Sequence, residues 1–504
     1  MRDYKNNDDV RQFMQDVQDQ IQYKPIVPEL CSELYQHMEE RQEEYMDQGM
    51  DQEKAARAAL QDLGDPSEIG VRLNQIHRVE NPGFLLWGIL ALVVMGGIYQ
   101  ITYHIQSYWY AEGSAAVQLI YLIKENIHIM MGIPLLFAVI YLGYPWLIKH
   151  CLRLLKGFLV YSIIVFLLNL LNMAGFTQDN LRPFLWNIYM LELPILMLSV
   201  PMLMIFSYKI RNKWRYSFLI SIAVYAVIAF FGAHRSGGFV GFTYQVIFLI
   251  ASFFMFLFMA YKRFFSENRK KSMIAATLLC VTVLSVWGAY KWESLEYYFK
   301  QCFYPDTVAN DHLSDAYNSL LIKDLLSRAD LIGEVELSEQ EMLSYFDYSW
   351  YYDGIIRVDN REWRREPAEL SGLEDILPQH YHNNYMIAYF ILSYGWLPGI
   401  FLFLLLSGIC YWLFSIALQI RNPIGQLTAL SAALCITLQA ALYIMGNLGY
   451  QFGYFCVLPY LSEGKVNHIT NILLTGILLS AFRYDKVIKE PGENDAVFWR
   501  TEST

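Results

Sequence analysis

Residues Gln439–Phe482 read QAALYIMGNLGYQFGYFCVLPYLSEGKVNHITNILLTGILLSAF, and this stretch decides the class of fold. It holds the end of one apolar run, 424–447, then a connection rich in Gly and aromatic residues, then most of a second run, 467–485. An α-helix of about 20 residues crosses a hydrocarbon core of about 30 Å. Because lipid offers no partner to free backbone groups, such runs must be helical. The stretch therefore predicts two membrane-spanning helices.

The composition of the whole chain supports this interpretation. Of 504 residues, 55% are hydrophobic and only 17% are charged, whereas soluble domains average about 25% charged. We expect an all-α polytopic membrane protein with about ten spans. The predicted spans are 83–103, 126–148, 157–177, 184–208, 216–233, 239–261, 272–290, 385–419, 424–447 and 467–485.

Basic residues mark every second connection between these spans, which predicts that these connections and both termini are cytoplasmic. They are Lys149, Arg153 and Lys156; Lys209, Arg211, Lys213 and Arg215; Lys262, Arg263, Arg269, Lys270 and Lys271; Arg421; Arg483, Lys486 and Lys489. The opposite side carries one insertion, 291–383, which is acidic and rich in aromatic residues. It is too long for a simple connector and predicts a folded extracytoplasmic loop.

Residues 1–80 form a separate polar module ahead of the first span. Helical spacing of apolar residues predicts one helix over 28–50, a second from Asp51 to Leu63 and a third after Gly64-Asp65-Pro66-Ser67. The patterns ELYQHMEE, GMDQEKA and LGDPSEI resemble the three-helix HAAS or permease-prefix domain, which precedes membrane segments on the cytoplasmic side. This resemblance implies a cytoplasmic regulatory partner for 1–80. Residues 81–486 then form the transmembrane core, and 487–504 a cytoplasmic tail.

The order Gln439, then Leu458-Pro459-Tyr460-Leu461-Ser462-Glu463-Gly464, then an apolar helix resembles the end of the FtsW/RodA/SpoVE (SEDS) family. Leu377-Pro-Gln-His-Tyr-His-Asn-Asn384 resembles the family's Leu-Pro-Glu-x-His-Thr-Asp, and Tyr317-Asn-Ser-Leu-Leu-Ile its Tyr-Gln-x-x-x-Ser-Leu-Ile. The resemblance implies a bacterial plasma-membrane protein of peptidoglycan synthesis in division, elongation or sporulation. It also implies an undecaprenyl-linked disaccharide precursor (lipid II) as substrate and a class B penicillin-binding protein as partner.

The chain departs from the family at its catalytic Asp, whose position falls on Asn384. Polymerising the precursor requires a group that takes a proton from the acceptor hydroxyl, and an amide cannot do so. The sequence therefore places the activity as a peptidoglycan glycosyltransferase in doubt and favours a binding or regulatory role. Glu374 and Asp375, ten and nine residues upstream, are alternative proton acceptors; otherwise they are solvated loop acids.

The candidate substrate-binding residues are polar or small, and they lie in or next to the predicted spans or in the outer loop. Glu192 is an acid inside an apolar run, where a charge is costly unless it has a function or a partner. Arg364 and Arg365 suit diphosphate oxygens, or form a solvated face of the loop. The 459–465 segment contributes Pro459, Ser462, Gly464 and Lys465, where Lys465 is either a pyrophosphate ligand or half of a surface ion pair.

Other classes of function remain open at this point. A lipid-linked precursor flippase or transporter also fits ten spans and Glu192, although the two halves of the chain show no internal repeat. A non-catalytic regulatory scaffold is a further alternative. We expect no cofactor, no metal site and no nucleic-acid partner; His380 and His382 lack the spacing of a ligand pair.

Overall fold

The elements of the computed structural model are all helical within the residues that it describes. These are residues 8–106, 115–173, 191–212, 216–231, 241–309, 315–345, 372–373, 376–378, 381–461 and 464–487. The chain divides into two compact units. We call residues 1–81 with 483–504 the N-terminal unit, and residues 82–482 the membrane unit.

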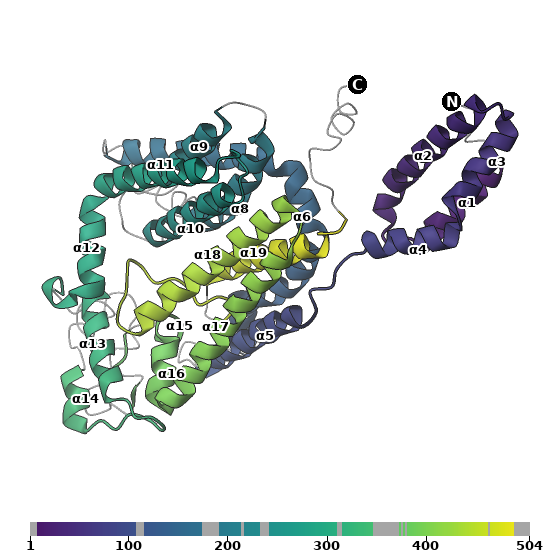
Figure 1. Ribbon diagram of the computed structural model, residues 1–504. Helices are drawn as coiled ribbons and strands as arrows, with labels where there is room; N and C mark the ends of the chain where they lie inside the picture. The colour runs from purple at the N-terminus through teal and green to yellow at the C-terminus, as the bar shows by residue number, and fades with distance from the viewer. Residues whose placement is uncertain are drawn as a thin grey trace. The chain divides into compact units, whose positions relative to one another are not determined.

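The N-terminal unit contains four α-helices in its described part, one more than the sequence analysis predicts. They are α1 (Asp8–Gln20), α2 (Val27–Asp47, after a 3-10 turn at Lys24–Ile26), α3 (Gln52–Leu63) and α4 (Pro66–Ile76) (Figure 1). The additional helix, α1, buries Val10, Phe13, Met14 and Val17. Their spacing is that of one face of an amphipathic helix, so the signal for α1 was present in the sequence.

Local signals set the boundaries of α3 and α4. The Asp51 carboxylate accepts a hydrogen bond from the Lys54 N–H at 2.9 Å and so caps α3. Gly64 ends α3 with φ 94°, a conformation that Gly adopts without steric cost. Asp65 then caps α4 by accepting from the Ser67 N–H, with Pro66 at the first helical position. The predicted start at Asp51 and stop at Gly64 agree with these helices.

The residues that follow the last helix of the chain belong to the N-terminal unit. The Glu80 N–H donates to the Arg483 carbonyl at 2.9 Å, and the Glu80 carboxylate forms an ion pair with Lys486. The rings of Tyr23 and Tyr484 lie 5.7 Å apart. We call the contacts of Glu80 with Arg483 and Lys486 the terminal clasp.

The membrane unit holds the remaining helices. They are α5 (Gly83–Gln106), α6 (Ala115–Met173), α8 (Glu192–Ile210), α9 (Ser217–Phe231), α10 (Gly241–Tyr261), α11 (Arg269–Tyr290), α12 (Trp292–Phe303), α13 (Asp315–Arg328), α14 (Glu339–Tyr345), α15 (Tyr381–Asn384), α16 (Met386–Tyr394), α17 (Trp396–Gln419), α18 (Pro423–Asn447) and α19 (Lys465–Arg483), with a 3-10 turn at Pro305–Thr307.

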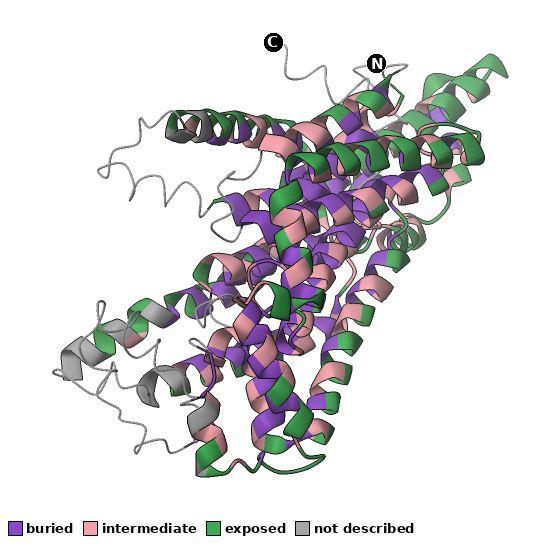
Figure 2. Ribbon diagram, turned by 90° about the vertical axis from the view of Figure 1, so that its left-hand side faces the viewer, coloured by how far each residue is buried: buried purple, intermediate pink, exposed green. Residues whose placement is uncertain are grey.

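Seven described helices are long and apolar enough to cross a membrane. Among them, α8, α10 and α18 form the centre: they pack against one another, and 67% of the apolar window of each is buried (Figure 2). By contrast, α17 exposes large apolar side chains along its length, including Phe401, Leu404 and Tyr411. A soluble monomer rarely exposes such a surface, whereas lipid solvates it. The protein is therefore an all-α polytopic membrane protein, as predicted.

One helix replaces two predicted spans and the loop between them. The predicted spans 126–148 and 157–177 both fall on α6, which at 59 residues is about 90 Å long. The connection carrying Lys149, Arg153 and Lys156 is thus helical and not a loop. Two prolines, Pro134 and Pro145, lie inside the helix.

Three other predicted spans differ in detail from the observed helices. The predicted span 216–233 is α9, which has only 15 residues. The span 467–485 is α19, whose first two turns carry Asn467, His468 and Asn471 and lower its hydropathy. The span 385–419 is divided into α16 and α17 at Gly395, which has φ 96°. Backbone atoms of residues 330–335 pair with those of 392–397 across this break, which satisfies the groups that the break frees.

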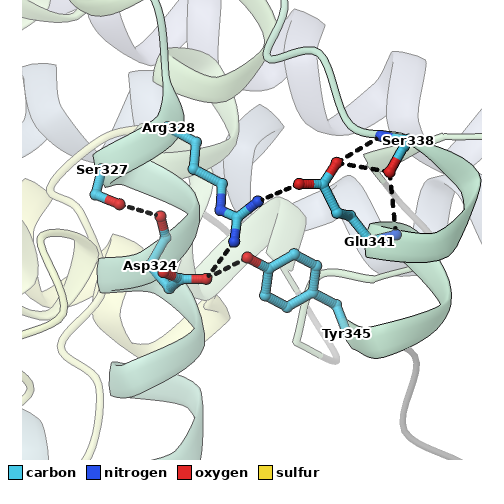
Figure 3. Close-up of polar contacts among 6 residues, drawn as sticks. All are labelled: Asp324, Ser327, Arg328, Ser338, Glu341 and Tyr345. Carbon is cyan, nitrogen blue, oxygen red and sulfur yellow. Dashed lines mark hydrogen bonds and ion pairs between the residues drawn. The ribbon is translucent and has the colours of Figure 1, made fainter.

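The described part of the predicted outer loop is mostly helical. After α11, the chain continues into α12 and then α13 (Figure 1). Polar contacts hold α14 against α13 (Figure 3). Arg328 forms ion pairs with Asp324 at 3.5 Å and Glu341 at 2.7 Å, and the Tyr345 hydroxyl donates to the Asp324 carboxylate. We call this group of residues on α13 and α14 the outer clasp.

Candidate functional site

Asn384 lies at the end of α15 and is held by the end of α18. Its carbonyl accepts a hydrogen bond from Asn447 Nδ2 at 2.9 Å. The Asn447 Oδ1 atom in turn accepts from the Ile387 N–H at 2.9 Å and the Ala388 N–H at 3.0 Å, so it caps the first turn of α16. Asn447 itself is fully buried. Because the amide of one side chain satisfies both helix ends, the position of Asn384 is rigidly defined.

A second residue of α18 supports the same turn. The Tyr443 hydroxyl donates to the Asn383 carbonyl at 2.7 Å, and the Met386 N–H donates to the same hydroxyl at 3.3 Å. Tyr443 is fully buried. The backbone of 383–388 is therefore fixed by two side chains one turn apart on α18.

Next to Asn384, the Tyr385 side chain leads to a buried glutamine. The Tyr385 hydroxyl donates to Gln451 Oε1 at 3.1 Å, while Gln451 Nε2 donates to the Gly453 carbonyl at 3.1 Å. The other Nε2 hydrogen is directed to the side chain of Asp315, which accepts it. Gln451 thus uses its oxygen and both amide hydrogens, which fixes its orientation.

Asp315 is a carboxylate that the sequence analysis did not select. It is the first residue of α13, is only partly exposed, and lies among the aromatic side chains of Tyr298, Tyr385 and Tyr454. Burial raises the pKa of the Asp315 carboxyl, and the hydrogen bond from Gln451 offsets part of that rise. The signal available in the sequence was its position two residues before Tyr317, in a segment that resembles the family.

The connection after α18 brings α13 against this site. A Cβ on Gly449 would lie 2.7 Å from the Ser319 carbonyl oxygen, so only Gly allows the approach. The Lys323 ammonium lies over the Tyr450 ring at 4.0 Å from its centroid. Burial lowers the pKa of Lys323. The site therefore combines a carboxylate and an ammonium group from one helix, α13, with the polar end of α18.

The 459–465 segment leads into α19. Pro459 is buried, and Tyr460 has φ 70°, an unusual conformation for a residue with a Cβ. The Tyr460 hydroxyl is hydrogen-bonded to Thr475. Gly464, with φ 141°, offers its carbonyl to the His468 N–H at 2.7 Å and so begins α19, and Lys465 is exposed.

Glu192 lies elsewhere in the fold. It is the first residue of α8 and is buried, with 4% of its surface exposed. The structure therefore places Glu192 on a different helix from Asn384 and from the 459–465 segment. Ser462, Arg364, Arg365, Glu374 and Asp375 lie outside the described residues, as does His380.

A comparison with protein families identifies the part of the chain that carries this site. The family model FTSW_RODA_SPOVE, described as cell cycle protein, matches residues 373–487. The match covers less than a quarter of the chain, and over this segment the chain is similar to the FTSW_RODA_SPOVE family. The resemblance predicted from Gln439–Phe482 and from Leu377–Asn384 is thereby confirmed. Within the FTSW_RODA_SPOVE segment lie Asn384, Asn447 and Gln451, whereas Asp315 and Glu192 lie before it.

Two further comparisons complete the picture. No curated protein matches the chain. One chain of a solved structure is similar at a TM-score of 0.47 and 14% identity, over 80% of this chain and 98% of that chain. That structure is described as "Structural coordination of polymerization and crosslinking by a peptidoglycan synthase complex".

Proposed function

We propose that this FTSW_RODA_SPOVE protein acts in peptidoglycan synthesis and binds the undecaprenyl-linked disaccharide precursor at the outer end of its membrane unit. The observation that carries the proposal is the family match at 373–487, because this segment supplies the polar turn around Asn384 and the end of α18. We place both termini in the cytoplasm and the protein in the bacterial plasma membrane, on the basic residues that follow α8, α10, α17 and α19.

The chemistry at Asn384 sets a limit on this function. Its amide has no lone pair of sufficient basicity to accept the proton of an acceptor hydroxyl. Asn384 is therefore assigned to the site as a positioning residue through its backbone. Pro459, Ser462, Gly464 and Lys465 remain candidates for contact with the lipid-linked headgroup, as do Arg364 and Arg365. We retain Glu374 and Asp375 as candidate acids and Glu192 as a candidate polar contact within the membrane.

Two partners follow from the proposal. A class B penicillin-binding protein is expected to bind the membrane unit, since the glycan strands must be cross-linked after polymerisation. A cytoplasmic regulator is expected to bind the helices of 1–80.

The first test is binding of purified lipid II to the full chain in lipid nanodiscs, with undecaprenyl phosphate as the control lipid. We expect tighter binding of lipid II, because the disaccharide and pyrophosphate supply the polar groups that the site recognises.

We also expect Asn384→Asp to raise the rate of glycan polymerisation, because it places a carboxylate at the family's position. Equal binding of the two lipids would contradict the proposal. The alternative function is a transporter. It would be supported if the protein transported a headgroup-labelled lipid, if this transport required Glu192, and if it persisted after removal of residues 300–375.

A further inference from the structure

The side chain of Asn384 cannot act as a base, but a carboxylate from another part of the chain reaches the same cluster. Asp315 is joined to Tyr385 through Gln451, and Tyr385 is the residue directly after Asn384. The three side chains come from α13, from the α15–α16 junction and from the connection after α18. No feature of local sequence brings them together, so their association is a property of the fold.

We propose that Asp315 is the proton acceptor for glycan polymerisation in this chain and takes the role that Asn384 cannot perform. This inference rests on the proposed function, since it concerns the same precursor. The contacts of Asp315 tie it to the turn that carries Asn384.

The step balances with a carboxylate at this position. The acceptor sugar hydroxyl oxygen attacks the anomeric carbon of the lipid-linked donor, and a glycosidic C–O bond forms. The C–O bond between that carbon and undecaprenyl pyrophosphate breaks, and its electron pair leaves with the pyrophosphate. The hydroxyl proton passes to the Asp315 carboxylate, which becomes neutral. No oxidant, reductant or cofactor is needed.

The surroundings of Asp315 suit a base. Burial among Tyr298, Tyr385 and Tyr454 disfavours the charged carboxylate and so makes it a stronger proton acceptor. Gln451 donates to it and holds it in one orientation, and Gln451 is itself held by Gly453 and Tyr385. Partial exposure of Asp315 leaves the carboxylate accessible to substrate.

A structural role is the competing explanation, because an acid in the first turn stabilises a helix. Asp315→Asn separates the two roles. Asn keeps the shape of Asp and an oxygen that can accept from Gln451, so the helix loses only the charge in its first turn, but Asn cannot take a proton. The matched control is Asp330→Asn, which removes an exposed carboxylate from the same outer segment.

The experiment measures lipid II binding and glycan polymerisation by the full chain in nanodiscs, with and without a class B penicillin-binding protein. Wild type and Asp330→Asn are expected to polymerise. Asp315→Asn is expected to bind lipid II normally and to lose about 10²–10⁴-fold in rate. The acidic limb of the wild-type pH–rate profile is expected above the ordinary range of an Asp carboxyl, because activity requires the ionised form and burial raises the pKa of Asp315.

The outcomes distinguish this inference from the proposed function. If Asp315→Asn polymerises at the wild-type rate, or loses lipid II binding as well, Asp315 is not the base. If wild type binds lipid II but never polymerises, the inference is overturned while the proposed function stands. If wild type does not bind lipid II, the proposed function fails and the inference fails with it.

Discussion

At the scale of single residues, the turn at Asn384 depends on Asn447 and Gln451, whose side chains use both their oxygen and their amide hydrogens. Asn447 joins the end of α15 to the start of α16, and Gln451 joins Tyr385 to Asp315. A buried polar group that is satisfied in this way fixes one geometry, because any alternative leaves a donor or acceptor unpaired. The same logic explains why the turn at Asn384 has one defined shape.

A glycine on α5 is expected to be essential for the segment that leads into α19. A Cβ on Gly96 would lie 2.9 Å from Leu461 Cα and closer still to the Tyr460 carbonyl oxygen. Gly96→Ala should therefore force the backbone of 460–461 away from α5 and destabilise the protein by about 1–3 kcal/mol. The measurement is the thermal unfolding midpoint of the purified protein in detergent.

Gly88→Ala, on the same helix α5, is the control for this substitution. A Cβ on Gly88 meets no atom within 4 Å. Ala is the better helix former, so this variant should be neutral or slightly more stable. Equal midpoints for the two variants would show that α5 and the 460–461 backbone are not in close contact.

The sequence could predict the site only in part at this scale. Asn384, Pro459, Gly464 and Lys465 were recognisable because they stand in motifs that run along the chain. Asp315 lies next to the segment that starts at Tyr317 but is not part of its motif, and its relation to Asn384 exists only after α13 packs against the connection following α18. Contacts between distant parts of the chain are set by tertiary packing, which the residue pattern along one sequence does not reveal.

At the scale of elements, α6 shows why basic residues alone do not define a loop. Lys149, Arg153 and Lys156 were interpreted as a connection between two spans. Lys, Arg and the intervening Leu are good helix formers, and the helix continues through Gly157, which directly follows Lys156. The apolar pattern correctly located the membrane-spanning residues of α6, but it could not show that the helix continues through residues 149–156.

The outer clasp is expected to hold α14 in place through Arg328. Exposed ion pairs contribute about 0–1 kcal/mol each, so Arg328→Ala should change global stability little. It should nevertheless increase hydrogen exchange in 339–345, because α14 has only seven residues and depends on contacts with α13. Exchange measured by mass spectrometry on the full chain tests this.

The matched control is Lys300→Ala, which breaks an ion pair with Glu296 within the single helix α12. It should leave exchange in 339–345 unchanged. If Arg328→Ala also leaves this segment protected, the clasp does not position α14.

At the scale of the whole molecule, the terminal clasp joins the two ends of the chain that flank the membrane unit. The ion pair with Lys486 lowers the pKa of Glu80 from its ordinary value of 4.5. A carboxyl with a lowered pKa stabilises the folded state above its ordinary pKa, and that contribution is lost as pH falls through the lowered value. Protection of 483–487 against hydrogen exchange, referred to the intrinsic rate at each pH, should therefore be constant near neutrality and decline below pH 4.5.

Lys486→Ala should remove this dependence on pH and lower the protection already at neutral pH. Arg72→Ala, which breaks an exposed pair with Glu68 inside α4, serves as the control and should change neither. A protection of 483–487 that is the same in wild type and Lys486→Ala at every pH would contradict the assignment.

The terminal clasp also constrains the path of the chain by simple parity. Glu80 and Arg483 are hydrogen-bonded to each other, so the chain leaves for the membrane unit and returns from it on the same side of the bilayer. Between them it must cross an even number of times, whereas seven described helices meet the criteria of length and hydropathy. An odd number of additional crossings is therefore required, and among the described helices α9 and α19 are candidates. The short and polar helices at the margins are thus as necessary to the topology as the apolar ones at the centre.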